Sequence, residues 1–570
     1  MAKWVISAKK ADFKAIAEEF GIDQVTARII RNRDIEGMEN IRKYLYGTLA
    51  DIPSPHLLKD ADKAADILVN KIGEGKKIRI LGDYDIDGVS ATYILHKSLT
   101  TLGADADYYI PDRILDGYGI NDHLIDAAIA DRVDTIITCD NGISACNEIS
   151  RAKEAGITVI VTDHHEVPYD MKDGEKIYRI PPADAVVNPK QQDCGYPAKN
   201  ICGAVVAFKL MCVLFDHMNI PHDELDEFVE IEAIATVGDV MDLQGENRIL
   251  VKEGLKRLKN TRNKGLRALI RACELEDKPI TAYHIGFVIG PCINASGRLD
   301  TAARSLALLE SDSVDEAEKL AGDLHDLNVT RKAMTEEGCK EAERLIEENH
   351  MDDDKVLVVY LPECHESLAG IIAGRIREKY YKPVFVMTKG EHAVKGSGRS
   401  IEAYSMYDEM NKCADLFLHF GGHPMAAGFS VEEENVEKLR RRLNEECTLT
   451  EKELTPKTVI DVAVPFSYLS KKFINELALL EPFGKENRKP VFAMKELRVL
   501  YPKIVGKNKN VVRMMLEEKN GFKIGAVYFG EPEPFMERLK LPQPITVTYY
   551  PEINVYNDRE SILVVVTDFR

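Results

Sequence analysis

The sequence predicts an α/β protein built around a parallel sheet, with a smaller second α/β domain and a C-terminal β-barrel. Continuous Val/Ile runs alternate with helical segments between residues 76 and 165, a strand–helix–strand pattern covers residues 355–387, and short β runs begin near Thr455. A chain of 570 residues is too long for one hydrophobic core, so these patterns belong to separate domains.

The composition is that of a globular protein, with 45% hydrophobic residues. No apolar run is long enough to cross a bilayer and "MAKWVISAKK" lacks the apolar core of a signal peptide, so we expect a cytoplasmic protein without membrane contact. The eleven cysteines form no CxxC pair, which fits a reducing compartment and argues against a zinc ribbon or a disulfide framework. The net charge of −19 is unlike that of a protein that merely coats nucleic acid; an enzyme need be basic only locally.

The parallel sheet is predicted from three short apolar strands, within residues 76–83, 133–138 and 157–162. A helix follows the first strand at "SATYILHKSLTTLG", and an Asn-Gly turn with a helix through Ala145 follows the second. Continuous apolar strands that alternate with helices indicate a parallel sheet covered on both faces.

Acidic and histidine side chains come directly after each of these strands. "GDYDIDG" places Asp85 and Asp87 after the first, Asp140 follows the second, and "TDHHE" places His164 and His165 after the third. Ligands of open α/β sheets bind beyond the carboxyl ends of the strands, so these side chains are expected at one edge. A fourth segment, "EFVEIEAIATVGDVMDL", is predicted to be helical through Ala235 and broken at Gly238, and it would bring Asp239 to the same edge.

The collected set is rich in oxygen ligands and holds one imidazole: Asp85, Asp87, Asp140, His164 and Asp239. Such a set suits Mn²⁺ or Mg²⁺ rather than a structural zinc. So many carboxylates can bridge two divalent cations, about 3.5–4 Å apart as in other two-metal sites, whose charge compensates the repulsion among the aspartates.

Helix capping is the competing interpretation of these aspartates. An Asp after a strand is a common N-cap, and for Asp140 taken alone the cap is the stronger interpretation. Capping does not explain why three strands carry acids to one edge together with two adjacent histidines. We expect Asp83 to point away from the cluster, because alternate residues of an extended segment face opposite ways.

The second α/β domain is predicted to follow one or two long helices within residues 311–350, where Leu and Ala recur at helical spacing. Its segment 371–400 is locally basic in an acidic chain. The glycines of "KGSGRS" let backbone N–H groups approach a phosphate, and a simple hairpin turn is an equal alternative. "FGGHPMAAG" is predicted to be a loop that enters a helix, with His423 as a helix cap or a core histidine.

The C-terminal barrel is predicted from six short β runs with polar turns: "TVIDVAV", "PVFAMKELRVL", "VVRMMLEE", "FKIGAVYF", "PITVTYY" and "SILVVVTDF". A basic, partly aromatic group on it could hold a single strand of nucleic acid: Tyr501, Lys503, Lys507, Lys509 and Arg513. An ordinary lysine-bearing loop is the alternative.

The motifs "DYDIDG", "CDNG", "TDHHE" and "ATVGDVMDL" resemble the four phosphoesterase motifs of the DHH family. The chain from about residue 50 onward resembles one branch of it, the RecJ-type single-strand-specific exonucleases, in these stretches in the family's order: "IPDRILDGYGIN", "VNPK", "CGAVVAFKL", "GPCINASGRL", "LHDLNVTRK", "KGSGRSI", "FGGHPMAAGF" and "LEPFGKENRKPVF".

The resemblance implies roles for individual residues. Asp85, Asp87, Asp140, His164 and Asp239 fall on metal-binding positions, and His165 falls on a position that faces the scissile phosphate or supports the ligands. The 5′-terminal phosphate positions match Arg113, Ser397, Gly398 and Arg399; Asn294 and Arg298 fall in the motif that closes the catalytic lobe, and His423 in a glycine-rich loop facing it. Cys292 stands where the family commonly has an Arg, which puts the role of the 290s segment in doubt.

The resemblance also implies a division of the chain. It predicts an N-terminal segment at 1–50, a DHH catalytic domain at 51–310, a helical connector at 311–350, a DHH-associated substrate-binding domain at 351–450 and an OB-fold at 451–570. The second lobe is expected to close the site into a channel too narrow for a duplex.

The predicted function is metal-dependent hydrolysis of single-stranded DNA from the 5′ end to mononucleotides, in DNA repair and recombination. Two cations would bind the scissile phosphate and lower the pKa of a water, and His165 would stabilise the transition state. We expect a monomer with a helicase and a single-strand-binding protein as partners. The alternatives are a phosphodiesterase for short oligonucleotides or cyclic dinucleotides, and a non-catalytic strand-binding scaffold with a decayed site.

Overall fold

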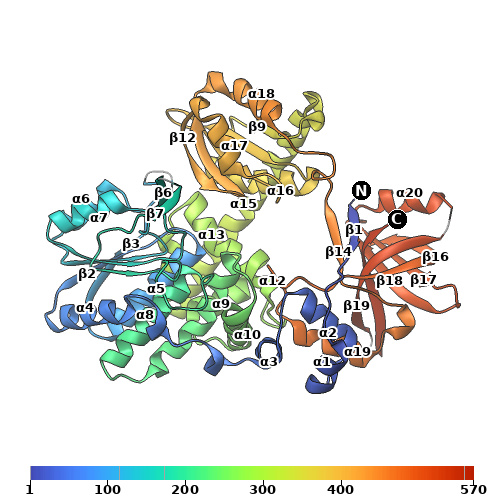
Figure 1. Cartoon of the computed structure of the whole chain (residues 1–570), viewed down its shortest axis with the longest axis horizontal. Coiled ribbons are helices and arrows are strands. Elements are labelled where there is room, and N and C mark those ends of the chain that lie inside the picture. Colours follow the sequence, from blue (N-terminus) through green and yellow to red (C-terminus); the bar gives the residue numbers. More distant parts are fainter. Residues whose placement is uncertain (1, 114–115, 118, 173, 543, 557–558) are drawn as a thin grey trace. The chain divides into compact units, whose positions relative to one another are not determined.

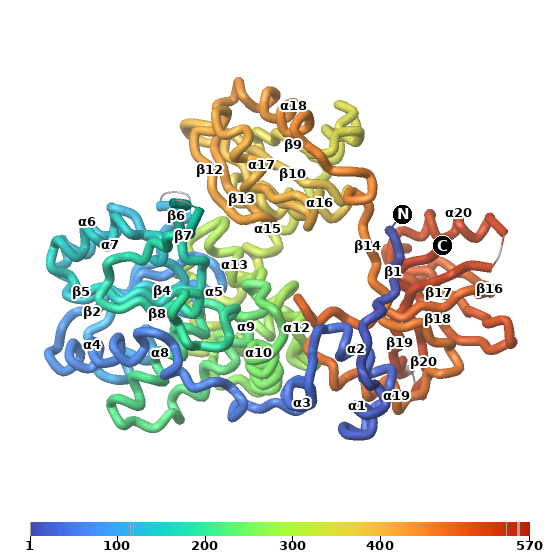
Figure 2. Tube along the Cα trace, in the orientation of Figure 1, coloured from blue at the N-terminus to red at the C-terminus, as the bar shows by residue number. Residues whose placement is uncertain are grey.

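The structure is a computed structural model that describes residues 2–113, 116–117, 119–172, 174–542, 544–556 and 559–570 (Figures 1 and 2). Within these residues the chain divides into two compact units, each made from separated segments. The first unit holds residues 53–239 and 254–456, and the second unit holds residues 2–52, 240–253 and 457–570. None of the helices that the structure describes combines the length and the apolar character that crossing a bilayer requires.

A five-stranded parallel sheet forms the base of the first unit, in the order β3-β2-β4-β5-β8. Its strands are β2 (Lys77–Leu81), β3 (Asp105–Tyr109), β4 (Thr135–Cys139), β5 (Thr158–Thr162) and β8 (Ala185–Val187). All five residues of β4 are buried, as expected for a strand covered on both faces. The three strands predicted from the Val/Ile runs are confirmed as β2, β4 and β5.

Helices cover both faces of this sheet (Figure 1). Helices α6 (Asp122–Ala130) and α7 (Cys146–Glu154) lie on one face, and α4 (Ala61–Gly73) and α8 (Gly203–His217) lie on the other; α5 (Ile86–Thr101) packs against α8. The prediction of a helix through Ala145 was wrong. Residues 142–145 form a turn closed by the Ala145 N–H to Gly142, and α7 begins only at Cys146.

The rest of this part of the first unit is helical: η3 (His222–Phe228), α9 (Val229–Gly238), α11 (Lys264–Ala272), α12 (Ala282–His284), the π-helix η4 (Ile285–Ile289), α13 (Gly290–Leu299) and α14 (Ala303–Glu310). Helix α10 (Gly245–Leu258) belongs to the second unit up to residue 253 and to the first unit from residue 254. Helix α9 runs on to Gly238, past the predicted end at Ala235, and Asp239 is its C-cap. A single helix, α15 (Val314–Glu348), confirms the predicted long helical connection.

The second sheet of the first unit is mixed, with five strands in the order β12-β13-β11-β10-β9. Its elements are β9 (Leu357–Tyr360), α16 (Ala369–Tyr380), β10 (Val384–Lys389), β11 (Val394–Arg399), α17 (Met406–Lys412), β12 (Phe417–His423), β13 (Ala426–Val431) and α18 (Val436–Glu446). The predicted strand–helix–strand pattern is confirmed by the parallel pair β9 and β10 around α16.

Two local predictions in this sheet were wrong. "KGSGRS" is neither a phosphate loop nor a hairpin turn: Ser397, Gly398 and Arg399 lie in β11, between β10 and β13. "FGGHPMAAG" enters no helix and forms the antiparallel hairpin of β12 and β13, with His423 opposite Ala426 and exposed. Small residues that suit close helix packing suit a crowded sheet equally well.

The barrel of the second unit has the strand order of an OB-fold. Strands β16 (Phe492–Val505), β17 (Val511–Glu517), β18 (Lys523–Phe529), β20 (Arg559–Phe569) and β19 (Ile545–Tyr556) follow one another, and β19 pairs back with β16 to close the barrel. Helix α20 (Pro532–Lys540) lies between β18 and β19 in the chain. The predicted β-barrel is confirmed.

The N-terminal residues belong to the same unit as the barrel. Strand β1 (Lys3–Ile6) pairs in parallel with β14 (Lys457–Ile460), and the helices α1 (Phe13–Phe20), α2 (Gln24–Asn32) and α3 (Met38–Tyr46) share a hydrophobic core with the barrel. Arg33, at the end of α2, forms a buried ion pair of 2.6 Å with Asp461. The backbone N–H of Val491 and the side chain of Asn32 also donate to Asp461.

Candidate active site

A cluster of carboxylates and imidazoles lies at the carboxyl end of the parallel sheet, as predicted. His164, after β5, places its Nε2 3.1 Å from Asp140 Oδ1, 3.6 Å from Asp87 Oδ2 and 3.7 Å from Asp239 Oδ2. Ligand atoms of Asp87, His164 and Asp239 lie within 4.8 Å of one another. Burial and the charge of His165 lower the pKa of His164 to about 3, so its imidazole is neutral, as a metal ligand must be.

A second group of ligand atoms consists of Asp83, Asp85 and Asp140, again within 4.8 Å of one another. The prediction that Asp83 points away was wrong, because β2 ends at Leu81 and the alternation of a regular strand no longer holds at residue 83. Asp83 is buried, and its Oδ1 receives no hydrogen bond within the part of the chain that the structure describes. Asp140 lies close to both groups, so the cluster offers two adjacent cation positions with one ligand between them.

The aspartates of the cluster are held by backbone groups. Asp85 is the N-cap of α5 and accepts from the N–H groups of Asp87 and Gly88, at 2.9 and 3.1 Å. Asp87 accepts from the first N–H groups of α8, those of Gly203 at 2.6 Å and Ala204 at 2.8 Å. Asp85 therefore serves as a cap and as a member of the cluster at once.

Asp140 is held in an unusual backbone conformation, with φ of 62°. It does not cap α7, whose N-cap is Ala145, so the capping interpretation was wrong for Asp140. A Cβ at residue 203 would lie 2.9 Å from Asp140 Oδ1, so Gly203 leaves the space that this carboxylate fills. Aspartate tolerates this left-handed conformation better than most residues, and such conformations occur often at functional sites.

The electrostatics of the cluster favour bound cations. Burial and the neighbouring carboxylates raise the pKa of Asp140 and of Asp83 well above the usual range for an aspartate. Burial and the charge of Asp85 raise the pKa of Asp87 to about 6, despite the two hydrogen bonds from α8. Divalent cations between these groups would remove that repulsion, and the oxygen-rich donor set fits Mn²⁺ or Mg²⁺.

Asp163 is a member of the site that the sequence analysis missed. Its Oδ1 accepts from His165 Nδ1 at 2.8 Å and from the backbone N–H groups of His164 and His165, while its Oδ2 accepts from the N–H of Ile143. Burial alone would lower the pKa of His165, but the hydrogen bond to Asp163 and the nearby carboxylates raise it to about 9. Asp163 thus orients His165 and keeps it protonated.

A cluster of arginines lies beside the carboxylates, and we call Arg113, Arg298 and Arg399 the arginine cluster. The Arg113 guanidinium lies 4.9 Å from the centre of the Tyr84 ring, and Arg298 Nη1 donates to the carbonyl of Ser367 at 2.9 Å. Burial and the neighbouring cations Arg113 and Arg331 lower the pKa of Arg298 to about 9, and burial and Arg113 lower that of Arg399. A group of half-buried cations favours binding of an anion.

The strand β11 positions Arg399 and Ser397 at the beginning of α16. Arg399 Nη1 donates to Ser397 Oγ at 3.0 Å and to the carbonyl of Gly398 at 2.7 Å. A Cβ at residue 370 would lie 2.8 Å from Arg399 Nη2 and 2.9 Å from Ser397 Oγ, so Gly370 admits both side chains. These polar groups and the helix N-terminus suit a phosphate.

The remaining predicted site residues take different positions. Asn294, on α13, accepts from the N–H of Ile86 at 2.8 Å and so braces the turn that carries Asp85 and Asp87. Cys292 is buried in the core, where Asn328 Nδ2 of α15 donates to its Sγ at 3.3 Å, so it does not face a phosphate. His423 is exposed at the end of β12.

Three family models match the chain. These are the DHH family N-terminal domain at residues 77–236, the DHHA1 domain at residues 353–449 and the RecJ OB domain at residues 460–568. The parallel sheet with its edge of aspartates and histidines is the catalytic fold of a DHH-family phosphoesterase.

Curated relatives match nearly the whole chain. It is 33% identical to the single-stranded-DNA-specific exonuclease RecJ of Bacillus subtilis over 99% of this chain and 70% of the relative, and 34% identical to that of Escherichia coli over 87% and 86%. The RecJ of Haemophilus influenzae is 32% identical over 95% of both chains. The chain belongs to the RecJ family.

Solved structures of the same family have the same fold. The RecJ of Thermus thermophilus in complex with Mn²⁺ matches with a TM-score of 0.83 and 29% identity, over all of this chain and 79% of that one. The same protein in complex with Mg²⁺ matches with a TM-score of 0.78 and 28% identity, over 100% and 78%.

Proposed function

We propose that this chain is a divalent-cation-dependent exonuclease that degrades single-stranded DNA from the 5′ end and releases mononucleotides. The observation that carries the proposal is the pair of ligand groups that meet at Asp140, with the arginine cluster beside them. The names of the relatives and the metal ions in the Thermus thermophilus structures support the same activity.

The residues that would hold the cations are Asp87, His164 and Asp239 in one position and Asp83 and Asp85 in the other, with Asp140 between them. When bound, a pair of divalent cations supplies a reactive water at neutral pH and offsets charge on the leaving oxygen. His165 is protonated through its bond to Asp163 and would donate a hydrogen bond to the scissile phosphate as negative charge develops.

The arginine cluster supports a 5′ polarity. Arg399 and Arg113 would bind the terminal phosphate of the strand, together with Ser397 and the N-terminus of α16. The guanidinium of Arg113 lies over the ring of Tyr84, and Tyr84 directly precedes Asp85 in the chain. The arginine cluster and the carboxylate cluster therefore meet at one turn. Fixing the terminal phosphate there would present the next phosphodiester to the carboxylates, and release of one nucleotide at a time follows.

The barrel would provide a further surface that binds the single strand. Tyr501 exposes 81% of its surface, and Lys503 lies opposite Arg513 on the neighbouring strand β17. Exposed aromatic rings and cations are the features that bind single strands without sequence preference. A barrel of this kind favours a long polymer over a short oligonucleotide or a cyclic dinucleotide.

Digestion of end-labelled single strands in Mn²⁺ tests the proposal. Strands that carry a 5′ block should persist, strands that carry a 3′ block should be degraded, and a dinucleotide should be cleaved far more slowly than a long strand. A start from the 3′ end would contradict the proposed polarity. Binding without turnover would favour the scaffold alternative.

Asp140→Asn provides the catalytic control for this digestion. Loss of the ligand between the two positions is expected to reduce the rate more than about 100-fold. The same substitution removes one of several repelling buried charges, so in EDTA its thermal midpoint should equal or exceed that of the wild type. Unchanged nuclease activity would remove Asp140 from the site.

The finer assignments are part of this proposal. We propose the division of the chain at about residues 50, 310, 350 and 450, which limited proteolysis would test. An enzyme confined to single strands needs a helicase to expose them, and co-purification with a helicase and a single-strand-binding protein is the test. Eleven free cysteines, all within the described residues, support a reducing cytoplasm.

A further inference from the structure

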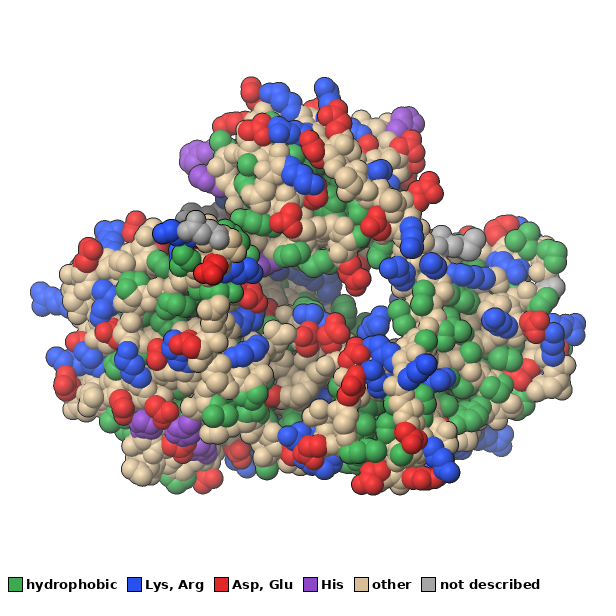
Figure 3. Space-filling model, in the orientation of Figure 1, with side chains coloured by type: hydrophobic (Ala, Val, Ile, Leu, Met, Phe, Trp, Pro, Cys, Tyr) green, Lys and Arg blue, Asp and Glu red, His purple; other side chains and the backbone are tan. Residues whose placement is uncertain are grey.

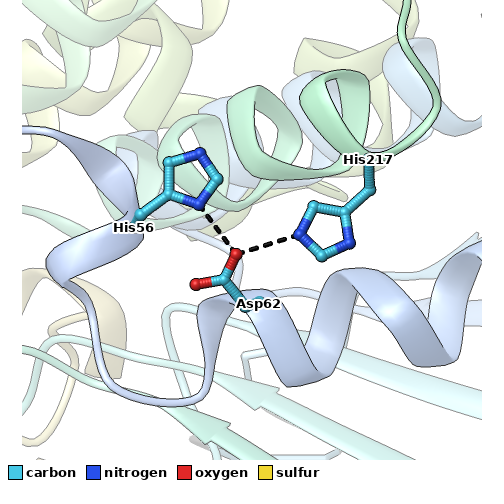
Figure 4. Close-up of side chains that lie close together, drawn as sticks. All are labelled: His56, Asp62 and His217. Carbon is cyan, nitrogen blue, oxygen red and sulfur yellow. Dashed lines mark hydrogen bonds and ion pairs between the residues drawn. The ribbon is translucent and has the colours of Figure 1, made fainter.

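A second group of histidines and carboxylates lies on the surface of the first unit, outside the candidate active site. His56 comes from the short helix η2 (Pro55–Leu57), Asp62 from the first turn of α4, and His217 is the last residue of α8. His56 Nδ1 and His217 Nε2 both point to the same atom, Asp62 Oδ1, at 2.7 and 2.9 Å (Figure 4). Figure 3 shows histidine side chains gathered with acidic ones at the lower left of the view.

Each of these imidazoles has a second carboxylate on its other ring nitrogen. His56 Nε2 lies 3.2 Å from Asp216 Oδ2, and His217 Nδ1 lies 2.9 Å from Asp66 Oδ1. Histidines that bind a metal through one nitrogen almost always bond a carboxylate, carbonyl or water through the other, which fixes the tautomer and the ring orientation. The two rings are nearly parallel, with an interplanar angle of 16°.

This group is separate from the carboxylate cluster at the sheet edge. Helix α8 begins with Gly203, whose N–H donates to Asp87, and ends with His217. With 15 residues it is about 20 Å long, so the two groups lie at opposite ends of one helix. The carboxyl end of a helix also favours a cation.

Hydrogen bonds between these groups shift the pKa values of all three side chains. The hydrogen bonds to Asp62 raise the pKa of His56 and that of His217 above the ordinary value for histidine, while burial opposes the shift. Burial would raise the pKa of Asp62, but the hydrogen bonds from His217 and His56 lower it. Histidine binds a metal as the neutral imidazole and aspartate as the carboxylate, so this group would hold a cation more tightly at higher pH.

We propose that His56, Asp62 and His217 form a second cation site, which takes a transition-metal ion of the Zn²⁺ type. Two imidazoles and one carboxylate suit Zn²⁺ rather than Mg²⁺, and a water would complete a tetrahedral set. Ligand atoms around Zn²⁺ lie roughly 3.4 Å apart, so the observed 2.7 and 2.9 Å need to open by less than about 1 Å. The side chains of His56 and Asp62 are 40% and 50% exposed, which leaves them room to adjust.

The consequence of binding is structural. The ion would join η2 and α4 to the end of α8, the helix whose beginning holds Asp87. A ligand that binds only the folded state stabilises it in proportion to its occupancy. Zn²⁺ should therefore raise the thermal midpoint of the first unit without taking part in hydrolysis.

The test measures Zn²⁺ binding to the full chain with the carboxylate cluster saturated by Mg²⁺. Equilibrium dialysis is compared among the wild type, the double variant His56→Gln/His217→Gln, and the control His325→Gln. His325, on α15, is 40% exposed like His56, and its Nδ1 lies 3.6 Å from Asp326 Oδ1. Wild type and control should bind one more equivalent of Zn²⁺ than the double variant, with a higher thermal midpoint at pH 8 than without Zn²⁺.

Two further measurements keep the test decisive. Co²⁺ should give visible absorption bands in the wild type that are lost in the double variant, and Mg²⁺-dependent nuclease activity should be the same in both. If the double variant fails to fold, Asp62→Asn, which keeps the size of the side chain, replaces it. Equal Zn²⁺ equivalents and equal midpoint shifts in the wild type and a folded variant would overturn the proposal.

Discussion

Asp163 supports the two adjacent histidines of the site with a single carboxylate. Four N–H groups converge on its two oxygens, those of Ile143, His164 and His165 in the backbone and Nδ1 of His165. An asparagine has only one acceptor oxygen, so its amide N–H would face one of these donors. The carboxylate is therefore needed for its geometry as well as its charge.

We predict that Asp163→Asn lowers the nuclease rate by about 10- to 100-fold, as is typical when the partner of a metal-site histidine is lost. The reason is that His164 and His165 lose their fixed orientation while every proposed ligand remains. The Mn²⁺ concentration for half-maximal rate should rise, which a purely structural defect would not produce once the folded fraction is corrected for. An unchanged Mn²⁺ requirement would argue against this role.

A second prediction concerns Arg399, which contacts Ser397 and the beginning of α16. Arg399→Ala should raise KM for strands with a 5′ phosphate by about 10- to 100-fold, the value of one or two charge-assisted hydrogen bonds. Strands with a 5′ hydroxyl serve as the control, and their KM should change little. Equal effects on both substrates would mean that Arg399 does not bind the terminal phosphate.

At this scale the sequence predicts most of the carboxylate cluster, because the ends of parallel strands must meet at one edge. It misses Asp83, since the alternation rule applies only inside a regular strand and β2 ends two residues earlier. It also misses Asp163, whose partners are mostly backbone N–H groups that no side-chain pattern reveals. The three arginines come together from residues 113, 298 and 399, and nothing local in the sequence relates them.

Helices α5 and α14 are joined by a polar contact between partly buried side chains. His96 Nδ1 of α5 lies 2.5 Å from Glu310 Oε1 at the end of α14, and the hydroxyl of Tyr108 donates to the other oxygen of Glu310. The hydrogen bond with Glu310 raises the pKa of His96, and burial opposes it. The folded state therefore binds a proton more tightly than the unfolded chain does.

This linkage gives a pH prediction. The stabilisation is complete below the unfolded pKa of histidine, about 6.5, and is lost as the pH rises through the higher folded value. Glu310→Gln should lower the urea midpoint clearly at pH 6 and much less at pH 9. Glu318→Gln is the control, since Glu318 pairs with Arg271, which does not titrate in this range, and its effect should not depend on pH. A constant difference for Glu310→Gln would contradict the assignment.

Helices and strands are predicted best where apolar residues recur at a regular spacing, or without interruption, along the whole segment. Strands β2, β4 and β5, helix α15 and the barrel strands all have such patterns. The wrong element types fall on β11, β12 and β13. Glycine and alanine interrupt the hydrophobic pattern in these segments, and they become strands because they pair with neighbouring strands of the sheet. Local propensity is weakest where sheet neighbours decide the conformation.

On the scale of the molecule, the second unit depends on residues from both ends of the chain. Arg33 and Asp461 pair through two hydrogen bonds of 2.6 and 3.1 Å, with 4% and 3% of their side chains exposed. Breaking a buried pair leaves one charge uncompensated and typically costs about 3–5 kcal/mol. The first unit has no part in this pair.

We therefore predict that Arg33→Met lowers the free energy of unfolding of the second unit by about 3–5 kcal/mol and leaves that of the first unit unchanged. Calorimetry in saturating Mn²⁺ should resolve the two transitions. Arg31→Met is the matched control, because Arg31 pairs with the exposed Asp34 and Glu36, and its cost should stay below about 1 kcal/mol. A shift of both transitions would mean that the units unfold together.

The second unit is built from three separated segments of the chain, and this affects how it folds during translation. Residues 2–52 are translated well before their packing partners at 457–570. About 400 residues separate the two, which at about 5–20 residues per second means a wait of roughly 20–80 s. During that interval the apolar faces of α1, α2 and α3 have no core to join and stay exposed on the nascent chain.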